Sequence, residues 1–128
     1  MKIFLFMGIL SLLIAACGSA QPIITDNGKP GQIKVFVFQD ENNNGKMDAG
    51  EKGLTDRVLL SQGDTCPPQT KDFTQAATDV NGEALFSNLK PGIYCVGYFG
   101  DHSTTTKLAV TVNLSSEQQA EVLYGLIP

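Results

Sequence analysis

Oxygen-bearing side chains recur at a fixed spacing in the polar segment 40–51, DENNNGKMDAGE. Counted from its first residue, side-chain oxygens fall at positions one, three, five, nine and twelve, and a glycine at position six permits a sharp turn. Position seven offers a backbone carbonyl, so its cationic side chain can point away. This spacing wraps about six or seven oxygens around one point, as a hard cation requires. The expected calcium ligands are Asp40, Asn42, Asn44, Lys46 through its carbonyl, Asp48 and Glu51.

The residues that flank this loop are not those of a helix–loop–helix calcium site. The same twelve-residue pattern in an EF-hand lies between two helices, whereas residues 35–38, Val-Phe-Val-Phe, have the composition of a strand. We therefore expect a calcium-type loop on a β scaffold. The alternative is an Asn-rich turn without metal, because Asn, Asp and Gly favour turns by themselves. Magnesium fits less well, since it rarely occupies an all-protein cage.

The elements that position this loop are predicted to be strands. The expected strands are 32–39, 56–61, 73–78, 83–87, 93–99, 104–113 and 120–126. The first is apolar enough for burial on both faces, and the last has a short helix over 116–121 as its alternative. Asn81-Gly82 predicts a tight turn between two of them. The pattern predicts an all-β fold, a single seven-stranded β-sandwich, with a small barrel as the alternative.

The first sixteen residues have the order of a bacterial export signal. Lys2 precedes an apolar run over 3–14, which is shorter than the roughly 20 apolar residues that span a membrane. Residues 13–17, Leu-Ile-Ala-Ala-Cys, resemble the lipobox of bacterial lipoproteins, whose cysteine is lipidated. We therefore expect a lipoprotein signal peptide over 1–16 and a lipid on Cys17. The alternatives are a retained membrane helix and an ordinary secreted protein with an incidental Cys17.

The residues that follow the predicted signal peptide indicate how the rest of the chain is divided and where the protein is located. Residues 17–31 are rich in Gly, Pro and small polar residues, which predicts a lipidated tether. Residues 32–128 then form the single folded domain. Gly18 stands where an aspartate would favour retention at the inner membrane. The expected location is the bacterial cell envelope, lipid-anchored, at the outer membrane if the cell is Gram-negative.

Cys66 and Cys95 remain after the lipid is assigned to Cys17. A pair of cysteines in an oxidising compartment predicts a disulfide. On the chain-entropy model, closing the loop between residues 66 and 95 stabilises a fold by about 3.5 kcal/mol. Zinc is a poorer alternative, because two cysteines and one distant histidine make an incomplete ligand set.

The charge balance argues against nucleic-acid binding, and the surroundings of the single histidine in the sequence argue against catalysis. Nine basic and thirteen acidic side chains give a formal net charge of −4, without the basic patch that nucleic-acid binding requires. His102 lies between Asp101 and Ser103, but neighbours in sequence do not make a catalytic triad, which is a spatial arrangement. The sequence has no phosphate-binding glycine loop and no nucleophile elbow. We predict that the protein is not an enzyme and does not bind nucleic acid.

Two motifs in a fixed order resemble a known family. The first is the opening strand and acidic loop with Gly53-Leu54, and the second is the run 78–96, TDVNGEALFSNLKPGIYCV. Together with residues 124–128, they are similar to the SdrD B-like domains of bacterial surface proteins, to which collagen-adhesin B-type modules are related. The resemblance covers 32–128. It implies an immunoglobulin-like or prealbumin-like sandwich, calcium on the six residues named above, and a structural or adhesive role.

Three roles remain open for such a domain. Calcium can rigidify a structural or adhesive module. The domain can bind a carbohydrate or cell-wall polymer through exposed aromatics such as Tyr98 and Phe99, which lie near a strand end and could equally belong to the core. It can also serve as an accessory subunit of an envelope complex. Some related modules have an internal Lys–Asn isopeptide bond, which we do not expect here because Lys34 has no asparagine in the last strand. The expected partners are the membrane, through Cys17, and a protein or glycan at the envelope.

Overall fold

A computed structural model of the chain describes residues 23–128, so the predicted signal peptide and Cys17 lie outside the described residues. The strands are β1 (Gly31–Gln39), β2 (Arg57–Gln62), β3 (Thr74–Ala77), β4 (Glu83–Leu89), β5 (Gly92–Tyr98), β6 (Ala109–Leu114) and β7 (Gln119–Leu126). The described part of the chain is free of helices, including any long and apolar enough to cross a membrane.

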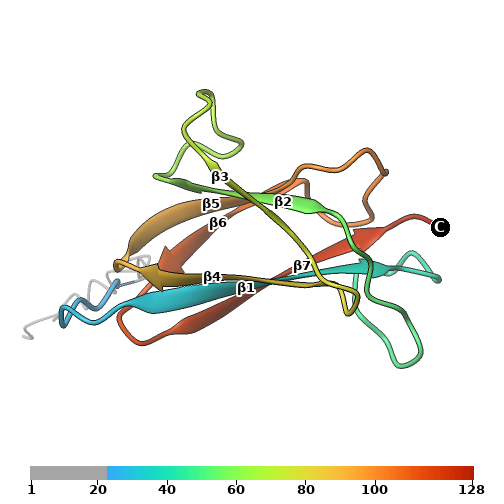
Figure 1. The fold of residues 1–128 in the computed structure, drawn as a ribbon, viewed down its shortest axis with the longest axis horizontal. Coiled ribbons are helices and arrows are strands. Elements are labelled where there is room, and N and C mark those ends of the chain that lie inside the picture. Colours follow the sequence, from blue (N-terminus) through green and yellow to red (C-terminus); the bar gives the residue numbers. More distant parts are fainter. Residues whose placement is uncertain (1–22) are drawn as a thin grey trace, which may run out of the picture.

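The seven strands form two sheets that face each other (Figure 1). In the three-stranded sheet, β1 lies between β4, with which it is antiparallel, and β7, with which it is parallel. The four-stranded sheet has the order β3-β2-β5-β6 and is antiparallel throughout. The prediction of an all-β, seven-stranded sandwich is therefore confirmed, including a strand rather than a helix at the end of the chain.

Alternating side chains from both sheets fill the space between them. Ile33, Val35 and Val37 of β1 have no exposed surface, and Val96 of β5 is equally buried. The other core side chains are those of Val58, Leu60, Ala84, Phe86, Tyr94, Tyr98, Leu114, Val122, Tyr124 and Leu126. The Tyr124 hydroxyl donates a hydrogen bond to the Val96 carbonyl across the sandwich, at 2.8 Å. The core thus contains one specific polar link between the sheets.

One strand prediction is confirmed and one needs correction. The first strand, β1, is largely buried on both faces: Phe38 on the outer face has no exposed surface, and Lys34 there packs over the Phe36 ring and pairs with Glu83 at 3.1 Å. The strand expected over 104–113 begins only at Ala109. Residues 104–105 instead follow the end of β7, where the Thr105 N–H donates to the Gly125 carbonyl at 2.9 Å.

The described part of the predicted tether packs against the domain. The Thr25 N–H donates to Ser115 at 3.0 Å, and the Ser116 N–H donates back to the Thr25 carbonyl at 2.8 Å. Lys29 pairs with Glu117 at 2.9 Å. These contacts fix residues 23–30 to the β6–β7 turn, at the end of the sandwich opposite the loop that follows β1 (Figure 1).

The predicted disulfide between Cys66 and Cys95 is present. Cys95 lies on the outer face of the four-stranded sheet, yet it has no exposed surface. The loop between β2 and β3 covers it and brings Pro67 and Pro68 near Leu59. The disulfide therefore holds a surface loop against a sheet face that would otherwise meet solvent.

Candidate functional site

The predicted cation loop begins where β1 ends and is closed at its base. Asp40 is fully buried, and its N–H donates to the Leu126 carbonyl at 2.9 Å. The Gln39 N–H donates to the Lys52 carbonyl at 2.8 Å. Gly53 then bridges back to Phe38. Both ends of the loop are thus anchored to the sandwich, while most of its residues are exposed.

Inside the loop, two asparagines converge on one carboxylate. Asn42 and Asn44 donate their amide N–H groups to Asp48 Oδ2 at 2.9 and 2.7 Å. Their amide oxygens accept from backbone N–H groups two residues further on, at Asn44 and Lys46, at 3.1 and 2.8 Å. Gly45 has a φ of 73°, which turns the chain at position six. The loop is therefore wound about Asp48.

The first and last residues of the predicted ligand set, Asp40 and Glu51, are turned toward the backbone. Asp40 Oδ1 and Oδ2 accept from the N–H groups of Asn44 and Gly45 at 3.1 and 2.7 Å. Glu51 accepts from the N–H groups of Glu41 and Asp48 at 3.0 and 2.7 Å. Within residues 23–128, no three His, Cys, Asp or Glu side chains meet closely enough to hold a metal ion.

The loop electrostatics favour charged carboxylates. Hydrogen bonds from Asn42 and Asn44 hold the pKa of Asp48 below its ordinary value, against burial and the nearby Asp40 carboxylate. Burial raises the pKa of Asp40, but hydrogen bonds from Thr105, Gly45 and Asn44 together lower it further. Two ionised carboxylates near one another, without a Lys or Arg among their hydrogen-bond donors, suit the approach of a cation.

The donor set fits a hard cation in type and spacing. The structure brings Asn42, Asn44 and Asp48 together, and it orients Asp40 and Glu51 around the same turn. The amide groups of Asn42 and Asn44 now direct their nitrogens toward Asp48. Rotating each amide by half a turn would exchange its nitrogen and oxygen, so that both oxygens would face the same space as the Asp48 carboxylate. Lys46 belongs to the turn through its backbone, which hydrogen bonds to Asn44.

A second polar cluster lies at the other end of the β1–β2 connection, and its pairing was not predicted from sequence. Asp56 accepts from the Tyr98 hydroxyl at 2.7 Å and lies 3.0 Å from His102 Nδ1. Gly100 leaves room for the cluster, because a Cβ there would lie 2.1 Å from the Tyr98 hydroxyl. The described side chains within hydrogen-bond distance of the His102 ring are those of Asp56 and Tyr98. Neither is the serine that a catalytic triad would place beside this histidine.

The position of Tyr98 also corrects the hypothesis that Tyr98 and Phe99 are both exposed for carbohydrate binding. Tyr98 belongs to the core with 7% of its surface exposed, and only Phe99 of the pair is exposed, at 40%. Burial and the Asp56 hydrogen bond raise the pKa of Tyr98 to about 12, so its hydroxyl remains a donor at neutral pH. A glycan surface built on both rings does not exist in this structure.

The two sequence motifs meet in space through a pair of glycines. Gly53 ends the cation loop, and Gly82 lies in the β3–β4 turn. A Cβ on Gly53 would lie 1.9 Å from the Asn81 carbonyl oxygen, and one on Gly82 would lie 2.2 Å from that of Val37. Gly82 also has a φ of 81°. Their lack of side chains lets the loop and the turn pack against β1.

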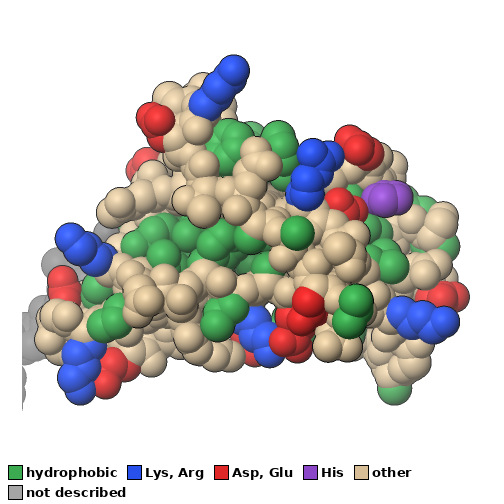
Figure 2. Space-filling model, in the orientation of Figure 1, with side chains coloured by type: hydrophobic (Ala, Val, Ile, Leu, Met, Phe, Trp, Pro, Cys, Tyr) green, Lys and Arg blue, Asp and Glu red, His purple; other side chains and the backbone are tan. Residues whose placement is uncertain are grey.

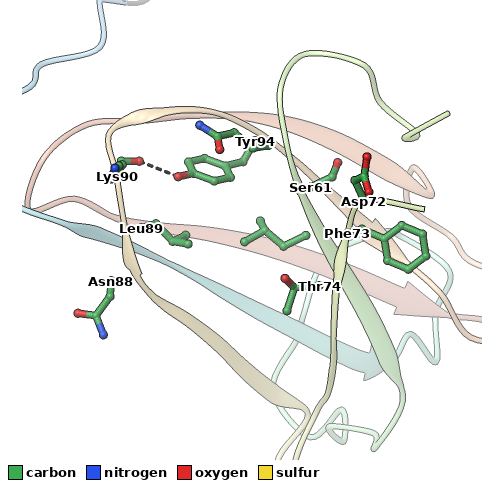
Figure 3. A pocket seen from close by; sticks show the side chains of 10 residues that line it. Ser61, Asp72, Phe73, Thr74, Asn88, Leu89, Lys90 and Tyr94 are labelled. Atoms are coloured by element: carbon green, nitrogen blue, oxygen red, sulfur yellow. Dashed lines mark hydrogen bonds between the residues drawn. The ribbon is translucent and has the colours of Figure 1, made fainter. Parts of the chain in front are cut away.

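A groove lies between the two sheets, lined by residues of β2, β3, β4 and β5 and of the turns that join them. Its volume is about 530 Å³, and Leu60, Phe73, Leu89 and Tyr94 give it an apolar lining. Figure 2 shows hydrophobic side chains gathered in a strip across this face of the molecule. Polar side chains surround this lining, including that of Asn88, and Figure 3 shows them on both sides of the groove. The Tyr94 hydroxyl is held by the Lys90 carbonyl at 2.8 Å (Figure 3).

The fold and loop together define a small β-sandwich module with an acidic connection after its first strand. The chain belongs to the SdrD B-like domain family, whose model matches residues 31–122. Serine-aspartate repeat-containing protein C of Staphylococcus aureus is 32% identical over 76 residues, covering 58% of this chain and 8% of that protein. Colossin-A of Dictyostelium discoideum is 34% identical over 64 residues, covering 50% of this chain and 1% of that protein.

Solved structures of the same fold include pilins. The full-length major pilin SpaD of Corynebacterium diphtheriae has a TM-score of 0.55 at 16% identity, over 83% of this chain and 34% of that chain. A streptococcal ancillary pilin has a TM-score of 0.53 at 16% identity, over 78% of this chain and 33% of that one. This chain therefore corresponds to a minor part of each of these proteins.

Proposed function

We propose that this chain is a lipid-anchored protein of the bacterial cell envelope, with a β-sandwich that calcium stabilises and that serves a structural or adhesive role. The observation that carries the proposal is the loop 40–51, where two asparagines and backbone N–H groups gather around Asp48 and Asp40. The family membership and the names of its relatives, a serine-aspartate repeat protein and pilins, support the role and the location.

Calcium in this loop would act on the domain through the loop's two anchored ends. The residues that would hold it are Asp40, Asn42, Asn44, Lys46, Asp48 and Glu51. An ion that binds only the folded state adds stability with its concentration, by about 2.7 kcal/mol at 100 times the dissociation constant. Because the loop joins the two sheets through β1 and β2, this stabilisation would stiffen one end of the sandwich.

The test is a set of melting curves of the processed chain in excess EDTA, in calcium and in magnesium. We expect a higher Tm in calcium alone. Glu51→Gln removes one carboxylate charge with little change of shape and should abolish the rise. Glu41→Gln is the matched control, because the Glu41 side chain is exposed and outside the ligand set. An equal Tm in all three solutions, with a folded protein, would refute calcium binding.

The lipid anchor has its own test. Radioactive palmitate fed to expressing cells should label the wild-type chain and leave Cys17→Ser unlabelled. The labelled chain should fractionate with membranes, and the variant should be released in soluble form. A soluble, unlabelled wild-type chain would contradict the anchor while leaving the calcium site untouched.

A second candidate function is binding of a carbohydrate or cell-wall polymer. The groove beside β4 favours it, because polar side chains there surround an apolar lining, an arrangement suited to sugar rings and their hydroxyls. A glycan array probed with the wild type and with Asn88→Ala separates the two functions. A signal that the variant loses would support glycan binding, and its absence would leave the structural or adhesive role. An accessory role in an envelope complex predicts instead a partner that co-purifies from membranes.

A further inference from the structure

The connection between β1 and β2 is clamped at both ends by one other loop. Asp40 opens this connection and Asp56 closes it. Residues 99–108, the β5–β6 loop, reach both: Thr105 Oγ1 donates to Asp40 Oδ2 at 2.5 Å, and His102 lies against Asp56. The connection that contains the cation loop is therefore joined at both of its ends to the β5–β6 loop.

The backbone fixes Thr105 in place independently of its hydroxyl. Its N–H donates to the Gly125 carbonyl at 2.9 Å, and Thr104 bridges to Leu126. The Ile127 N–H donates to the Ser103 carbonyl at 3.0 Å. Residues 103–105 thus run beside the end of β7, and the Thr105 side chain is directed from a pinned backbone.

Gly125 provides the space in which this hydroxyl reaches the carboxylate. A Cβ at Gly125 would lie 2.4 Å from Thr105 Oγ1 and 3.1 Å from Asp40 Oδ2. Any side chain at this position would push the hydroxyl away from Asp40. The Thr105–Asp40 hydrogen bond therefore depends on the absence of a side chain at Gly125, near the end of β7.

The neighbouring threonines do not share this role. The Thr104 hydroxyl donates to the Thr106 carbonyl at 2.9 Å. The Thr106 hydroxyl is buried without a hydrogen-bond partner among the described residues. Of these three similar side chains, Thr105 alone bonds to the cation loop within residues 23–128. Thr106 consequently provides a matched control, because its hydroxyl can be removed without breaking a described contact.

We propose that Thr105 is a positioning residue for the cation site and couples that site to the β5–β6 loop. The inference rests on the proposed calcium binding. A carboxylate has about four lone-pair directions, so Asp40 can accept from Thr105, Gly45 and Asn44 and still face a cation. Partners that orient a metal ligand in this way typically contribute about 10- to 100-fold to metal affinity.

Coupling works in both directions. If Thr105 helps Asp40 to bind calcium, calcium must hold Thr105 more firmly by the same factor. The loop that calcium steadies carries exposed residues at its tip, including Asp101 and His102. The site would therefore control the order of a surface that lies outside the calcium-binding segment itself.

The experiment compares calcium affinity by titration calorimetry in the processed full chain, solubilised in mild detergent. Thr105→Val, which keeps the shape and removes the hydroxyl, should bind calcium at least about 10-fold more weakly. Thr105→Ser should restore wild-type affinity, and Thr106→Val should leave it unchanged. If Thr105→Val does not fold by circular dichroism, Thr105→Ala supplies the same deletion with less bulk.

Amide hydrogen exchange of residues 100–106 gives the second readout. Calcium should slow exchange there in the wild type and in Thr106→Val, and this effect should be lost in Thr105→Val. Wild-type affinity in folded Thr105→Val, or an equal loss in Thr106→Val, would overturn the inference while calcium binding stands. A wild type that binds no calcium would instead refute the proposed function, and the inference with it.

Discussion

The Cys66–Cys95 disulfide makes a measurable prediction because it closes a loop of known length. The cysteines are 29 residues apart. On the chain-entropy model, a loop of that size contributes about 3.5 kcal/mol by restricting the unfolded chain. For a domain of about 100 residues, this corresponds to roughly 15 °C in Tm. We expect the double variant Cys66→Ala/Cys95→Ala to fold with its Tm lowered by about that amount.

The structure also says where the variant should loosen first. Within the described residues, Gly63 makes the one backbone hydrogen bond that ties the 63–73 loop to another element, to Ile93 at 2.8 Å. Phe73 adds an aromatic contact with Phe99, with ring centroids 5.7 Å apart. Without the disulfide, little else holds this loop to the sheet, and the exposed Lys71 becomes accessible to trypsin.

The assay combines thermal unfolding, followed by circular dichroism, with limited trypsin digestion and mass spectrometry. Wild-type protein treated with a reducing agent should behave like the double variant, which controls for the loss of the buried Cys95 sulfur. A Tm within about 3 °C of wild type, together with resistance at Lys71, would refute the reasoning. It would mean that the loop is held to the sheet by packing alone.

Two further perturbations test the loop-to-turn contact and the second polar cluster. Gly82→Ala should lower the free energy of unfolding by at least about 2 kcal/mol in urea titrations, because its Cβ meets a carbonyl. Gly28→Ala also has a positive φ but meets nothing within 4 Å, so it should cost less, and equal costs would contradict the clash. Burial raises the pKa of Asp56, but hydrogen bonds from Tyr98, Arg57 and His102 hold it below 3.8, so its stabilisation is present above that pH and lost as pH falls through the folded pKa. Asp56→Asn should flatten that part of the stability curve in denaturant titrations across pH, and an unchanged acid limb would contradict it.

Local patterns were sufficient to predict most of the sandwich. The two-residue period of a strand puts Tyr94, Val96 and Tyr98 of β5 on one face, and the structure buries that face. The same period therefore argued against Tyr98 as an exposed aromatic. The spacing of oxygen-bearing side chains after the first strand predicted a turning polar loop, and the structure has one, in which Asn42 and Asn44 donate to Asp48. Calcium in that loop stays a prediction. The number of cysteines predicted the pairing of Cys66 with Cys95. Each of these features depends on residues close in sequence or on a single possible pairing.

Contacts between distant segments account for what the sequence did not predict. Residues 104–106 are three threonines, which favour a strand by composition. Their actual position depends on the buried Asp40 carboxylate and on the Gly125 carbonyl, neither of which is near in sequence. Asp56 and His102 likewise show no local pattern that would pair them. Such contacts follow from the topology, which brings the β1–β2 and β5–β6 connections to the same end.

The parallel pairing of β1 with β7 gives this sandwich a direction. Both strands run from the end where residues 23–30 dock to the end that bears the cation loop (Figure 1). Nine residues of β1 separate the two ends by about 30 Å. We expect the proposed lipid on Cys17, six residues before Ile23, to bring the docked end toward the membrane. The Thr105–Asp40 contact lies near the other end of β1 and β7, so the proposed calcium would bind at the end of the sandwich away from the lipid.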